Sequence, residues 1–69
     1  MITWELLGES WEGRTVVDHF KLRHTDKGWL VSHRHVDDRS FQQIAIGADL
    51  DKAKELAERW AEQAVQVNP

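Results

Sequence analysis

The chain has 69 residues, no cysteine, a formal net charge of −3 and 41% hydrophobic residues. This composition is typical of one small globular domain, and the missing cysteine excludes disulfides, thiolate zinc sites and a thiol nucleophile. No apolar run approaches the roughly 20 residues of a membrane span, and the N-terminus lacks a signal-peptide pattern. We therefore expect a complete cytoplasmic protein with a single domain over residues 1–69.

The N-terminal segment predicts a strand followed by a loop. Ile2, Trp4 and Leu6 alternate with polar residues, as in a half-buried strand. Residues 8–13 have glycine at both ends and predict a loop that carries Trp11 among acidic neighbours. A tryptophan in such a loop either contacts a partner or folds back on the core, and the sequence leaves both open.

The middle of the chain predicts two hairpins. Segments 16–24 and 29–36 are rich in β-branched and aromatic residues, with a turn at 25–28. That turn pairs His24 with Trp29, Leu22 with Val31, Phe20 with His33, and Asp18 with His35. A second turn at 37–40 leads into a strand over 41–46 and pairs Val36 with Phe41, His33 with Ile44, and Val31 with Ile46.

The two predicted registers agree about the faces of the sheet. The core face collects Val16, Phe20, Leu22, Trp29, Val31, Ile44 and Ile46. The opposite, outer face collects His19, Lys21, Arg23, Ser32, Arg34 and Gln43, with Val17, Leu30, Val36 and Phe41 among them. No acid is expected among the bases of this outer face.

The C-terminal segment predicts a helix over 50–65. Asp49 is a favourable N-cap, and Glu55 precedes Arg59 by four residues. The apolar residues at helical spacing are Leu50, Ala53, Leu56, Ala57, Trp60 and Ala64. The predicted fold is therefore α+β: an antiparallel β-meander of three to four strands, packed on one face by a single C-terminal helix (β-β-β-β-α).

One H-x-H pair raises the question of a metal site. His33 and His35 point the same way from a strand, and Asp18 lies opposite His35. These give three ligands at most, so we expect His35 to bond to Asp18 instead, with no metal and no cofactor. No serine has the context of a nucleophile, and we expect no enzymatic activity.

The outer face is the predicted site of function. We expect a non-enzymatic binding module of bacterial or phage type, accessory or inhibitory, that docks on a protein partner or on a second copy of itself. The residues expected to contact the partner are Trp11, Val17, Lys21, Arg23, Leu30, Arg34, Val36 and Phe41.

Two alternatives stay open. Nucleic acid is one candidate, bound through Lys21, Arg23 and Arg34. The expected sheet and helix are similar in topology alone to plant AP2-type and integrase arm-binding domains. The other alternative is metal binding at His33 and His35.

Overall fold

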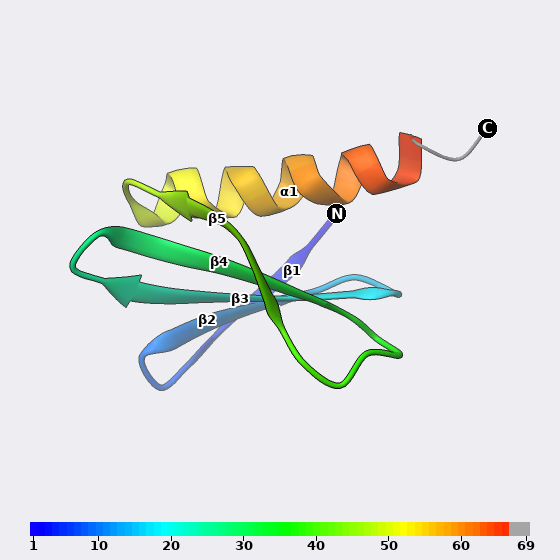
Figure 1. Cartoon of the computed structure of the whole chain (residues 1–69), viewed down its shortest axis with the longest axis horizontal. Helices are drawn as coiled ribbons and strands as arrows, with labels where there is room; N and C mark the ends of the chain where they lie inside the picture. Colours follow the sequence, from blue (N-terminus) through cyan, green and yellow to red (C-terminus); the bar gives the residue numbers. More distant parts are fainter. Residues whose placement is uncertain (67–69) are drawn as a thin grey trace.

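The chain folds into a five-stranded antiparallel sheet followed by one helix. The computed structural model describes the backbone of residues 1–66 and the side chains of residues 1–63. The elements are β1 (Thr3–Leu7), β2 (Ser10–Arg14), β3 (Asp18–Thr25), β4 (Gly28–His35), β5 (Gln42–Gly47) and α1 (Leu50–Gln66). The strands follow one another across the sheet in chain order, and α1 lies along one side of it (Figure 1). The α+β class, the antiparallel meander and the C-terminal helix are confirmed, but the sheet has five strands.

The additional strand is β2, which the sequence predicted as a loop. It pairs with both neighbours, so that Trp4, Gly13 and Phe20 lie side by side across three strands. Gly13 is buried, and a Cβ there would lie 2.5 Å from Ile2 Cγ2 and 2.6 Å from Trp4 Cζ3. Gly13, which in the sequence suggested a loop, is therefore needed in the strand because its missing side chain leaves room for Ile2 and Trp4.

The β3–β4 hairpin has the predicted register. All four predicted pairs, including Asp18 with His35, are present. The start of the hairpin was predicted wrongly, however, because β3 begins at Asp18 and Val16 is 94% exposed. Val16 lies in a turn that Thr15 holds together by accepting hydrogen bonds at Oγ1 from the backbone N–H of Asp18, at 2.9 Å, and of Val17, at 3.2 Å.

The predicted β4–β5 register is wrong. Val31 pairs with Ala45 and Leu30 with Ile46, and the register shifts again at a bulge between Val31 and Ser32. Ile46 therefore leaves the core face and is 44% exposed, whereas Ile44 still packs against the core. The longer turn before β5 and the bulge are the local cause, since each extra residue changes which side chains face the helix.

The core lies between α1 and the sheet. Phe20, Leu22 and Val31 are fully buried beneath Ala53 and Ala57 of the helix. Trp60 packs edge-on against Phe20, with ring centroids 6.0 Å apart. The helix begins as predicted, because Asp49 accepts a hydrogen bond from the backbone N–H of Lys52 at 2.8 Å. The Ala64 side chain, predicted in the apolar stripe, lies outside the described side chains.

Candidate interaction surface

The outer face of the sheet is the face that α1 does not cover. In an antiparallel sheet, alternate residues of a strand share a face, so His19, Lys21 and Arg23 point away from the buried Phe20 and Leu22. Leu30 and Arg34 of β4 point the same way as these three residues. The predicted separation of the two faces therefore holds for the central hairpin.

Phe41 and Val36 also belong to the outer face. The Phe41 ring lies edge-on to the His19 ring at 5.0 Å, with the Lys21 ammonium 5.7 Å and the Arg34 guanidinium 5.5 Å from its centroid. Val36 is 53% exposed beside Arg34. Val17 lies at the end of the hairpin, where it also lines a groove toward the helix.

A chain of hydrogen bonds fixes part of this surface. An arginine can only donate, so Arg34 Nη2 donates to His19 Nδ1 at 3.0 Å. His19 must then carry its proton on Nε2, which donates to the Glu12 carboxylate at 2.8 Å. Arg34 Nη1 also donates to the Asp38 carbonyl at 2.8 Å. Arg34 is therefore held within its own chain and has fewer donors for a partner than predicted.

The expectation that no acid interrupts the outer bases is wrong. β2 places Glu12 directly opposite Lys21, and β1 places Glu5 opposite Glu12 on the same face. The prediction failed because β2 had been assigned to a loop. The outer face thus has acids on β1 and β2 beside the bases Lys21 and Arg23 on β3, and the described residues form no ion pair with Arg23.

Trp11 does not belong to the outer face. It lies in β2 opposite Leu22, on the helix side, and packs against the core. The Lys54 ammonium of α1 lies 3.9 Å from a Trp11 ring centroid and 5.9 Å from a Trp4 ring centroid. Of the two roles left open, the fold supports core closure with a cation–π contact. Trp11 is therefore not among the side chains that the outer face presents to a partner.

The H-x-H pair is divided between two environments. His33 Nε2 hydrogen bonds with Asp18 Oδ1 at 2.8 Å, and its ring lies against Trp60 with centroids 3.9 Å apart. His35 Nδ1 accepts a hydrogen bond from the Asp37 backbone N–H at 3.1 Å. The predicted bond between His35 and Asp18 is therefore made by His33 instead. Within residues 1–63, no three carboxylate or imidazole side chains gather to hold a metal ion.

The same cluster also bears on catalysis. Thr15 Oγ1 donates to Asp18 Oδ2 at 3.3 Å, while His33 bonds to the other carboxylate oxygen. The carboxylate thus lies between the hydroxyl and the imidazole, whereas nucleophilic triads need the imidazole in the middle. The arrangement links the turn before β3 to β4, and it gives the Thr15 hydroxyl no imidazole base.

Comparisons with known family models, curated proteins and solved structures found no match. Within the described part of the chain, α1 is not long and apolar enough to cross a membrane. The side chains on the outer face of the sheet are therefore the available indication of function.

Proposed function

We propose that this protein is a non-enzymatic, cytoplasmic binding module that docks through the outer face of its sheet, with a second copy of itself as partner. The observation that carries the proposal is the open outer face, on which apolar side chains lie among charges of both signs. Leu30, Val36 and Phe41 supply the apolar part, and Ile46 and Leu7 extend it at the two edges of the sheet. Burial of such area is the usual source of affinity between proteins.

The distribution of charge favours a second copy. Two sheets that stack face to face keep their strands within about 30° of each other. A two-fold axis parallel to the strands and between β2 and β3 would superpose β3 of one copy on β2 of the other. Lys21 would then meet the partner copy at Glu12, the residue beside it in the same cross-strand row. Attraction between unlike charges would set this register and orientation.

The same operation pairs apolar side chains. Leu7, Ser10, Arg23 and Leu30 form the next row across the sheet. The axis would place Leu30 of one copy over Leu7 of the other. Arg23, free of ion pairs among the described residues, would lie over Ser10 of the partner copy, where its guanidinium can donate to the serine hydroxyl.

The solution mass as a function of concentration tests this proposal. We expect a dimer for the natural protein and a monomer for Leu30→Glu and for Leu7→Glu, because a buried unpaired carboxylate is costly. Leu6→Glu is the matched control, since Leu6 is 53% exposed on the opposite face of the same strand and Leu7 is 43% exposed. A natural protein that stays monomeric at high micromolar concentration, or equal effects at the two adjacent leucines, would refute the second-copy interface.

Nucleic acid is the second candidate, favoured by the presence of Lys21 and Arg23 on one exposed face. Glu5 and Glu12 on the same face oppose it. If DNA is the partner, retention on immobilised DNA will fall steeply with salt and will be lost in a Lys21→Glu, Arg23→Glu, Arg34→Glu variant. Retention that does not respond to either change would eliminate this candidate.

A further inference from the structure

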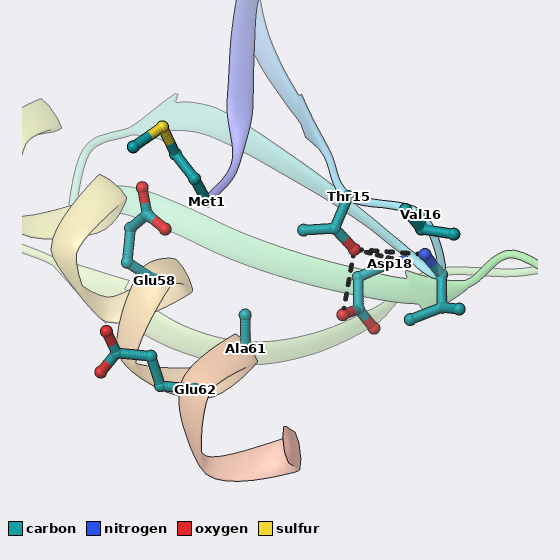
Figure 2. A pocket seen from close by; sticks show the side chains of 8 residues that line it. Met1, Thr15, Val16, Asp18, Glu58, Ala61 and Glu62 are labelled. Carbon is teal, nitrogen blue, oxygen red and sulfur yellow. Dashed lines mark hydrogen bonds between the residues drawn. The ribbon is translucent and has the colours of Figure 1, made fainter. Parts of the chain in front are cut away.

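A second surface, separate from the outer face, lies between the helix and the beginning of β3. Figure 2 shows a groove with Glu58 and Glu62 of α1 on one side, Thr15, Val16 and Asp18 on the other, and Met1 between them at the rim. The groove has a volume of about 820 Å³ and is open to solvent. Its size suits several side chains of a bound segment.

The walls of the groove are apolar and unusually exposed. Val16 is 94% exposed, Met1 fully exposed, and Val17 46% exposed. Val16 and Val17 are residue types that favour buried β-strands, but the turn at Thr15 holds both of them outside the sheet. Apolar side chains that a rigid turn presents to water can gain free energy when another molecule covers them.

The charges at the groove are predominantly negative. Glu58 and Glu62 form no ion pair with the described residues, and Asp18 is the third carboxylate of the lining. The last turn of α1 contains no lysine or arginine, so no cation of that turn offsets the negative end of the helix dipole. Among the described residues, the lining of the groove includes no lysine, arginine or histidine side chain. Arg14, His19 and Arg34 line a separate hollow on the other side of Thr15 and Asp18.

We propose that this groove binds a polypeptide segment in which lysine or arginine alternates with aliphatic residues. The aliphatic side chains would cover Val16 and Met1, while the cations would reach Glu58 and Glu62. Long basic side chains suit the site because their methylene stems can lie on apolar walls with the charge in contact with a carboxylate. The proposal does not depend on the outer face, because no residue of the Leu7–Leu30 interface lines the groove.

Backbone amide chemical shifts test the proposal with two defined probes. The basic probe is acetyl-Lys-Val-Lys-Leu-Lys-amide, and the acidic probe has glutamate in place of each lysine. We expect saturable shifts from the basic probe at residues 15–18 and 58–62, and no saturable shifts from the acidic probe. Equal responses to both probes, or shifts centred elsewhere, would overturn the proposal.

A pair of charge variants tests the electrostatic contribution to binding. Glu62→Lys should weaken binding of the basic probe by roughly three- to tenfold, from the loss of one attraction and the gain of one repulsion. Glu55→Lys changes the net charge by the same amount on the exposed side of α1, where Glu55 pairs with Arg59, and should change binding less than twofold.

The apolar contribution is tested by Val16→Ser, which should weaken binding about threefold without loss of the folded spectrum, because Val16 makes little contact with the core. Equal effects of Glu62→Lys and Glu55→Lys would mean that only net charge matters, and would reject a specific site. The same spectra report the fold of each variant, so a failed fold cannot be mistaken for lost binding.

Discussion

The helix α1 approaches the sheet very closely at Gly47, the last residue of β5. A Cβ at this position would lie 2.6 Å from the backbone nitrogen of Ala53, 2.8 Å from its Cα and 3.0 Å from its Cβ. Two of these three atoms belong to the helix backbone, which cannot move away by a side-chain rotation. We therefore expect Gly47→Ala to force α1 away from the sheet.

The cost can be estimated from general values. Overpacking a core costs about 1–3 kcal/mol, and contact with backbone favours the upper part of that range. Replacing glycine with alanine also restricts the unfolded chain, which returns about 0.4–1 kcal/mol. The net loss should be about 2 kcal/mol, and the melting temperature should fall by roughly 8–16 °C for a domain of this size.

Thermal and urea unfolding, followed by circular dichroism, measure this loss. The control is Gly8→Asn, because Gly8 has a φ of 63°, a Cβ there would have nothing within 4 Å, and asparagine tolerates this backbone conformation. We expect the control to change the free energy of unfolding by less than about 0.5 kcal/mol. If Gly47→Ala is no more destabilising than the control, the close contact between α1 and β5 is not a feature of the folded protein.

Two further predictions concern the helix start and the histidine pair. Asp49→Ala should lower the free energy of unfolding by about 1 kcal/mol, because the Lys52 N–H loses its acceptor. Asp49→Ser should retain most of the stability, because serine can also accept this hydrogen bond. Equal losses of stability in the two variants, measured by urea unfolding, would contradict the capping role. Neither zinc nor a chelator should shift the melting temperature, because His33 and Asp18 are bonded to each other and His35 to a separate turn. A rise with zinc would restore the metal hypothesis.

Much of the fold follows from local signals. The register of the β3–β4 hairpin could be predicted because a short turn fixes which residues are opposite, and its apolar residues then fall on one face. The helix could be predicted because Asp49 caps it and its apolar residues recur with helical spacing. For the same reason, the outward direction of Lys21, Arg23 and Leu30 could be predicted without coordinates.

The site was predicted less completely than the fold. The sequence identified an outer face with bases and apolar side chains, but it counted Trp11 among the expected partner contacts and omitted Glu12. Both errors come from β2, whose single glycine and polar residues resemble a loop. A glycine that leaves room for the Ile2 and Trp4 side chains cannot be distinguished by local pattern from a glycine that makes a turn.

The sequence by itself determined the elements whose signals are local: the capped helix, the central hairpin and the two faces of β3 and β4. Only the tertiary structure decided the position of β5. The alternation of Ile44 and Ile46 suggested that both face the core. In the structure Ile44 packs against the core, but Ile46 pairs with Leu30 on the outer face, and Ala45 and Gly47 lie opposite Val31 and Trp29 on the core face. The physical reason is the packing of α1, because Ala53 approaches so closely that only a small residue fits beneath it.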